Sequence, residues 1–238
     1  MHSYFFGGPA TRTVKTLIIA NVAVYLLQIA IHLLMGMGDN RFDGFLGLVP
    51  NTVTHNYSVW QFVTYMFLHV SVFHLFFNML TLFMFGNELA RKWGTPRFLR
   101  YYFITGIGAG ICSWLVAINS GSTVIGASGA VYGLLLAYGV MYPNRIVYLN
   151  FLFPIKVKWL VILMGGVAFL SSITGADSGI AHIAHLGGML VGYLYLKGSD
   201  WQYRYQVFNN QRRREQLKRQ FEVYYGDVRR KIEQDKKQ

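Results

Sequence analysis

The stretch Gly126-Ala127-Ser128-Gly129-Ala130-Val131-Tyr132-Gly133 opens an uncharged run that continues to Tyr142. A serine between glycines at the start of an apolar helix has two interpretations. In the first, the small residues let two membrane helices pack closely, and the serine bonds its own backbone. In the second, Ser128 is a nucleophile, and the glycines leave room for a substrate backbone beside its hydroxyl. A nucleophilic serine needs a base, which the rest of the chain must supply.

The composition is that of a membrane protein. Of the 238 residues, 53% are hydrophobic and 13% are charged, whereas soluble domains carry roughly 25% charged residues. Long uncharged stretches recur, so we expect an all-α, multi-pass membrane protein. The single cysteine, Cys112, excludes an intrachain disulfide. We expect no removable signal peptide, because no small-residue cleavage site follows a short apolar core near the N-terminus.

Windows of about 20 residues predict six transmembrane spans. They are expected near Thr16–Met35, Val70–Ala90, Phe98–Ile118, Val124–Tyr142, Val157–Thr174 and Gly179–Leu196. The apolar segment Ile146–Ile155 contains Pro154, and we expect it either to lie at the interface or to begin the fifth span. Before the second span, Trp60 and Tyr65 are typical of interfacial aromatic residues.

The basic residues predict the orientation of the chain. With both termini inside, Arg41 is the only one of the 22 Lys and Arg residues that falls outside. The positive-inside rule therefore predicts cytoplasmic termini, and we expect the cell (inner) membrane. The net charge of +12 then reflects topology, and we expect no nucleic-acid partner.

The same distribution divides the chain into three parts. We expect a cytoplasmic N-terminal segment (1–15), a six-helix membrane domain (16–197) and a basic cytoplasmic tail (198–238). The tail is expected to form charged helices, either at the anionic inner leaflet or simply in solvent.

Polar side chains within the spans gather at one depth. Ser128 on the fourth span, His182 and His185 on the sixth, and His74 and Asn78 on the second all lie roughly 5–12 Å from the outer ends, at 1.5 Å per residue. Polar groups inside a membrane are costly and often functional. His74 and Asn78 are four residues apart, so they share one face of the second span. From this face they could either stabilise an oxyanion or tie helices together.

Glycines are expected to bring His185 to Ser128. Two glycines, three and seven residues after His185, form a small face on the sixth span. The fourth span carries glycines at the same spacing, one and five residues after Ser128. If the two faces pack together, the histidine lies beside the serine, as a base lies beside its nucleophile.

Two other protease chemistries are disfavoured by the sequence. The chain has no His-Glu-x-x-His motif of a zinc enzyme, and no aspartate lies within a span. Asp177 falls in an outer loop, so no third member of a triad is expected. Four histidines could in principle gather a metal: His69, His74, His182 and His185. Because no carboxylate or cysteine lies near them to complete a usual site, we expect no metal and no cofactor.

Taken together, the motifs resemble those of the rhomboid intramembrane serine proteases. The matching residues are Gly126-x-Ser128-Gly129 with Tyr132, then His185-x-x-Gly188-x-x-x-Gly192, and His74-x-x-x-Asn78. Their order and the span count match over roughly residues 12–197. The resemblance implies a six-transmembrane-helix, rhomboid-like bundle. It also implies a serine endopeptidase that cleaves transmembrane protein substrates near the outer side of the lipid bilayer.

The resemblance further implies a role for each site residue. Ser128 would be the nucleophile and His185 the general base. His74 and Asn78, with the Ser128 backbone N–H, would form the oxyanion hole. The supporting residues would be Gly126 and Gly129, Tyr132 beneath the imidazole, and His69 with a structural role. His182 lies one turn nearer the outside than His185, and from this position we expect it to point toward the water-filled mouth.

Two positions depart from the family pattern. Gln61 follows Trp60 where the family usually has arginine, and Ala90 stands where a glutamate often lies four residues beyond the glycine matched by Gly86. These differences predict a less stable first outer loop and leave the catalytic pair unaffected.

The alternative function is a catalytically silent relative that binds membrane proteins, or a small transporter. Intact Ser128 and His185 argue against a silent relative. The absence of buried carboxylates argues against proton-coupled transport.

Overall fold

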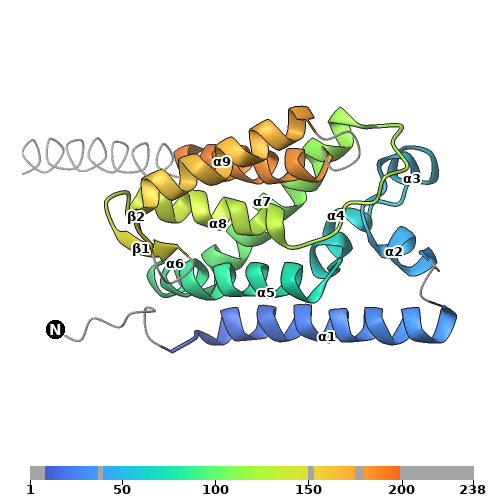
Figure 1. The fold of residues 1–238 in the computed structure, drawn as a ribbon, viewed down its shortest axis with the longest axis horizontal. Coiled ribbons are helices and arrows are strands. Elements are labelled where there is room, and N and C mark those ends of the chain that lie inside the picture. Colours follow the sequence, from blue (N-terminus) through green and yellow to red (C-terminus); the bar gives the residue numbers. More distant parts are fainter. Residues whose placement is uncertain (1–8, 37–39, 150–152, 175–179, 199–238) are drawn as a thin grey trace, which may run out of the picture. The chain divides into compact units, whose positions relative to one another are not determined.

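The computed structural model describes residues 9–36, 40–149, 153–174 and 180–198, and these are mostly helical (Figure 1). In chain order the elements are α1 (Arg12–Met35), α2 (Arg41–Leu46), α3 (Pro50–Asn56), α4 (Gln61–Thr64), η1 (Tyr65–Phe67), α5 (Val72–Thr81), η2 (Leu82–Gly86), α6 (Asn87–Trp93), α7 (Thr95–Val116), α8 (Ser128–Met141), β1 (Ile146–Leu149), β2 (Phe153–Lys156) and α9 (Val157–Thr174). Residues 180–198 are also helical. The predicted tail lies outside the described residues.

Four helical segments of the described chain are long and apolar enough to cross a membrane. They are α1, the continuous run Val72–Trp93 that joins α5, η2 and α6, then α7, and α9. In α1 and α9 only 17% of the most apolar window is buried inside the protein. Their exposed leucine, isoleucine and phenylalanine side chains therefore suit lipid contact. The protein is an integral, multi-pass, all-α membrane bundle, as the composition predicts.

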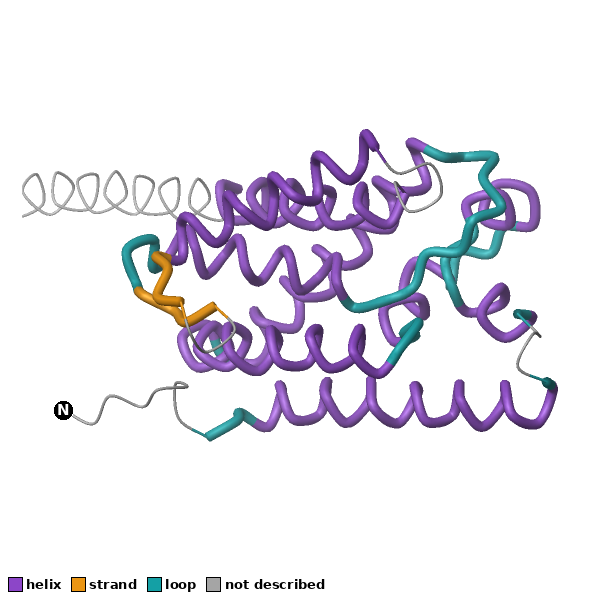
Figure 2. The backbone as a smooth tube through the Cα atoms, viewed as in Figure 1, coloured by secondary structure: helices purple, strands orange, loops and turns teal. Residues whose placement is uncertain are grey.

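The short helix α8 lies at the centre of the bundle. It packs against α7, α5, η2 and α9, and Figures 1 and 2 show it between α5 and α9. Its 14 residues make it about 21 Å long at 1.5 Å per residue, less than the roughly 30 Å of a hydrocarbon core. The predicted span began at Val124. Instead, Val124 pairs with Leu48 in an isolated β-bridge, and the helix begins at Ser128.

The segment after α8 corrects one prediction. Ile146–Ile155 does not begin the fifth span, because β1 and β2 form an antiparallel hairpin in which Pro154 lies opposite Tyr148. Helix α9 then has the bounds expected for the fifth span, Val157–Thr174. Proline at an edge strand leaves its missing N–H on the unpaired side.

The segment between α1 and α5 is held together by Gln61, at the position where the family usually has arginine. Its side chain is 1% exposed. Its Oε1 accepts hydrogen bonds from the Val49 N–H (2.9 Å) and the Thr52 hydroxyl (3.1 Å), and its Nε2 donates to the Gly44 carbonyl (2.9 Å). Glutamine thus satisfies donors and acceptors of the loop at once, which arginine, a donor only, cannot do.

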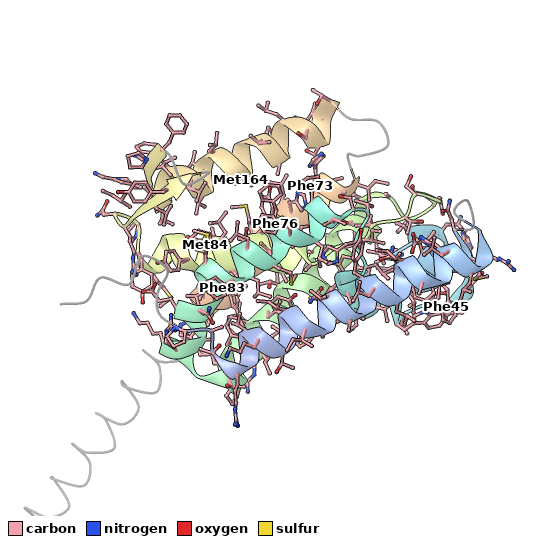
Figure 3. All side chains as sticks on the ribbon, turned by 60° about the horizontal axis from the view of Figure 1, so that its bottom comes forward. Phe45, Phe73, Phe76, Phe83, Met84 and Met164 are labelled. Atoms are coloured by element: carbon pink, nitrogen blue, oxygen red, sulfur yellow. The ribbon has the colours of Figure 1, made fainter. Side chains whose placement is uncertain are left out.

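The aromatic residues of this segment differ from one another in exposure. Trp60 is 41% exposed, donates its indole N–H to the Phe45 carbonyl (2.8 Å) and packs against the Phe45 ring, labelled in Figure 3. Tyr65 is 1% exposed, and its hydroxyl donates to the Gly106 carbonyl at 2.6 Å. The prediction of an interfacial Tyr65 is therefore wrong: a partner for its hydroxyl on α7 allows this side chain to be buried.

Candidate active site

Ser128 is placed at the N-terminus of α8 by the backbone at Gly126. This glycine has φ +127°, which a residue with a side chain rarely adopts. A Cβ here would also lie 2.7 Å from Cε1 of His74 and 3.7 Å from the Ser128 hydroxyl. Glycine therefore allows the turn into the helix and leaves the imidazole of His74 room beside the serine.

His185 lies within hydrogen-bond distance of Ser128. The distance from His185 Nε2 to Ser128 Oγ is 2.8 Å, across 57 residues of sequence. The ring of Tyr132, one turn along α8, is parallel to the imidazole, with centroids 4.3 Å apart and an interplanar angle of 4°. Stacking on one face and a hydrogen bond at the edge fix both the plane and the direction of the imidazole.

The close approach of the two helices rests on Gly188. A Cβ at this position would lie 2.0 Å from the backbone oxygen of Gly129. The predicted contact between the two glycine faces is therefore found for Gly188 and Gly129. The second pair does not meet, because Gly192 faces Tyr101 and Gly133 faces Thr105, both on α7. Helix α7 thus separates the helices beyond the site, and the faces converge only near Ser128.

His74 and Asn78 both lie on α5, and the ring of His74 lies against Gly126, two residues before Ser128. The Ser71 hydroxyl caps this helix by accepting a hydrogen bond from the His74 backbone N–H (3.1 Å). Asn78 is 5% exposed. Its Nδ2, like Nδ1 of His74, has no hydrogen-bond partner among the described residues. Buried polar atoms of this kind are suited to a ligand that brings an acceptor.

The two remaining histidines flank this group. His69 is 1% exposed and packs its ring edge-on to His74, with centroids 5.0 Å apart. Burial, together with the nearby His74, lowers the pKa of His69 to about 4, so its ring is neutral at physiological pH. His182 is partly exposed and lies edge-on to His185 at 5.6 Å. Among the residues that the structure describes, no three His, Cys, Asp or Glu side chains are grouped to hold a metal ion.

An apolar cavity lies beside α8, the helix that carries Ser128. It has a volume of about 330 Å³ and is lined by residues of α5, η2, α8, α9 and the hairpin, including Val131, one turn beyond Ser128. Figure 3 shows three of its lining residues, Phe76, Met84 and Met164, between α5 and α9. A surface of this kind accepts apolar side chains.

A polar cluster at the opposite end of α8 was not predicted from the sequence. The Tyr138 hydroxyl donates to Glu88 Oε2 (2.9 Å), and Arg145 pairs with the same carboxylate. The ring of Tyr138 also packs against Phe85. The sequence signal was a carboxylate, Glu88, at the end of an apolar run and close to Arg91 and Lys92. This cluster ties α6 to α8 and does not contribute to the serine site.

Known proteins resemble this chain over most of its length. The rhomboid domain model matches residues 56–198. RHOMBOID-like protein 1 of Arabidopsis thaliana is 32% identical over 165 residues, covering 68% of this chain and 40% of the relative. Rhomboid protease AarA of Providencia stuartii is 30% identical over 198 residues, covering 75% and 69%. Rhomboid protease GlpG of Yersinia pestis (strain Pestoides F) is 30% identical over 179 residues, covering 73% and 60%. The chain thus spans 40% to 69% of the length of these relatives.

Proposed function

Because the chain belongs to the rhomboid family, we propose that it is an intramembrane serine endopeptidase that cleaves transmembrane protein substrates. The observation that supports this best is the 2.8 Å between His185 Nε2 and Ser128 Oγ. A serine within reach of an oriented imidazole is the arrangement that nucleophilic catalysis requires. Relatives named as rhomboid proteases support the same class of activity.

The proposed reaction uses the serine and histidine in two steps. Ser128 Oγ attacks the scissile carbonyl carbon while His185 Nε2 takes the hydroxyl proton, and the imidazolium then protonates the leaving amine. Water, deprotonated by the same imidazole, next hydrolyses the acyl-enzyme and releases the serine. Because Tyr132 holds the imidazole plane, the ring returns to the same position for each proton transfer.

We assign the oxyanion hole to three donors. The backbone N–H of Ser128 lies at a helix N-terminus, where such groups have no partner within the helix and favour negative charge. The side chains of His74 and Asn78 approach from α5. Donors fixed in place before the charge develops are a large source of rate enhancement.

The proposed orientation puts both termini in the cytoplasm of the cell and the serine near the outer side of the inner membrane. The bilayer would supply the substrates, whose apolar side chains suit the cavity between α5 and α9. In a Cys112→Ala background, a cysteine introduced at the exposed Asn40 should react with an impermeant thiol reagent added outside. Labelling only from the inside would reverse the assignment.

Labelling by a fluorophosphonate tests the proposed chemistry. We expect the detergent-solubilised full chain to be labelled covalently and to cleave a reconstituted transmembrane substrate, and Ser128→Ala to lose both activities. A silent relative would show neither in the wild-type chain. Labelling that persists in Ser128→Ala would assign the nucleophile elsewhere.

Substitution of Asn78 tests the oxyanion hole. We expect Asn78→Ala to lower kcat by about 10- to 1000-fold, the range for one lost donor, with little change in KM. Asn87→Ala is the matched control, because Asn87 is also buried but bonds the Thr11 backbone, at the far end of this helical run. An unchanged kcat in Asn78→Ala would remove this residue from the role.

A further inference from the structure

One glutamine in the apolar helix α1 joins three segments of the protein. Gln28 is 3% exposed. Its Nε2 donates to Asp43 Oδ1 on α2 at 2.8 Å, and its Oε1 accepts from the His69 backbone N–H at 3.1 Å. A polar side chain inside a membrane helix is costly unless bonded. Here both the nitrogen and the oxygen of the Gln28 amide are hydrogen-bonded, and the oxygen bonds the backbone of His69, in the segment that leads into α5.

Asp43 determines which way the Gln28 amide points. An ionised carboxylate only accepts hydrogen bonds, so it takes the NH₂ end of the amide. The oxygen is then left for the His69 N–H. His32, four residues after Gln28 and on the same face of α1, places its Nε2 3.5 Å from the same carboxylate oxygen. The carboxylate is thereby held between two side chains of α1.

The segment held by Gln28 is in direct contact with the proposed oxyanion hole. The ring centroids of His69 and His74 lie 5.0 Å apart, and the ring of Tyr25 on α1 lies edge-on to His69 with centroids 6.4 Å apart. His74 in turn lies against Gly126, two residues before Ser128. Interiors are closely packed, so a shift of the His69 backbone moves its ring and the imidazole beside it.

We propose that Gln28, oriented by Asp43, is a positioning residue for His74, and this inference rests on the proposed protease function. Without the amide oxygen, the His69 N–H is buried beside apolar groups and must move to find another acceptor. The expected result is a misplaced oxyanion donor with an intact serine–histidine pair. Turnover should therefore fall more than substrate binding weakens.

The test measures kcat and KM for Gln28→Leu in the full chain, normalised to the fraction labelled by a fluorophosphonate at completion. We expect kcat to fall roughly 10-fold, less than the 10²–10³-fold for removing a donor outright. Asn21→Leu is the matched control: Asn21 is buried on the same face of α1, two turns away, and bonds the Leu17 carbonyl of its own helix. We expect this variant to retain its kcat. An equal fall in both variants would overturn the proposal.

A double-mutant cycle separates positioning from general stability. In a His74→Ala background, Gln28→Leu should have almost no further effect on kcat, because the group that it positions is gone. If the two substitutions lower kcat independently, so that their fold-losses multiply in the double mutant, Gln28 has only a structural role. Asp43→Ala should reproduce the loss, whereas Asp43→Asn, which still offers an acceptor oxygen, should lose less. If the wild-type chain is neither labelled nor active, the protease function fails; if it is active and Gln28→Leu matches it, this inference alone fails.

Discussion

His185→Ala is expected to abolish both substrate cleavage and fluorophosphonate labelling, whereas His182→Ala should retain a measurable fraction of each. The loss should reach roughly 10⁴- to 10⁶-fold in kcat, as when the base of a serine protease is removed. His185 lies at hydrogen-bond distance from Ser128 and stacks on Tyr132. His182 lies edge-on to that imidazole, with ring centroids 5.6 Å apart.

The comparison is informative because the two histidines lie one helical turn apart. Both variants remove an imidazole from the same helix, so a general loss of folding would affect them alike. Melting temperatures in detergent should be similar for the two. The reverse pattern, with an inactive His182→Ala and an active His185→Ala, would transfer the role of base to His182.

Gly188→Ala should cause the second largest loss, although this glycine has no chemical role. The added Cβ would lie 2.0 Å from the backbone oxygen of Gly129. Neither backbone can yield without moving its helix, so His185 and Ser128 must separate. A misplacement of about 1 Å costs on the order of 100-fold in rate, and overpacking of this kind destabilises a fold by about 1–3 kcal/mol.

Gly166→Ala on α9 is the matched control for this prediction. A Cβ there meets no atom within 4 Å, and alanine favours a helix over glycine by up to about 1 kcal/mol. Activity and melting temperature should therefore stay at or above the wild-type values in Gly166→Ala and fall in Gly188→Ala. Equal behaviour of the two variants would show that the helices can separate without cost.

The sequence was most informative where a local rule decides the structure. The apolar run Val157–Thr174 is bounded by charge and polar residues, and α9 has the same limits. For α8 the prediction began four residues too early, because hydropathy does not register the turn that Gly126 makes at φ +127°. The residues 146–156 are apolar enough for a helix or a strand, and only pairing across the chain made them a hairpin.

The site could be anticipated only where spacing carries the information. Ser128 and His185 could be paired in advance because each is followed by two glycines that are four residues apart. Gln61 and Gln28 could not be assigned, since their partners are backbone groups of distant segments. A glutamine in an apolar stretch signals that some partner exists, but the identity of that partner depends on tertiary structure.

The shortness of α8 has a consequence for how the membrane treats this protein. The first backbone N–H groups of α8, which begins at Ser128, have no acceptor within their own helix. Lipid offers no acceptor for such groups. In most membrane helices these groups lie in the headgroup region and bond water. In α8 these groups lie beside Ser128, and the proposed function puts them below the outer surface, where an acceptor has to come from a bound molecule. An extended polypeptide has the same problem inside a bilayer, because its carbonyl groups have lost their helical partners. Under the proposed function, the end of α8 is therefore where the carbonyl groups of an unwound substrate segment would find donors.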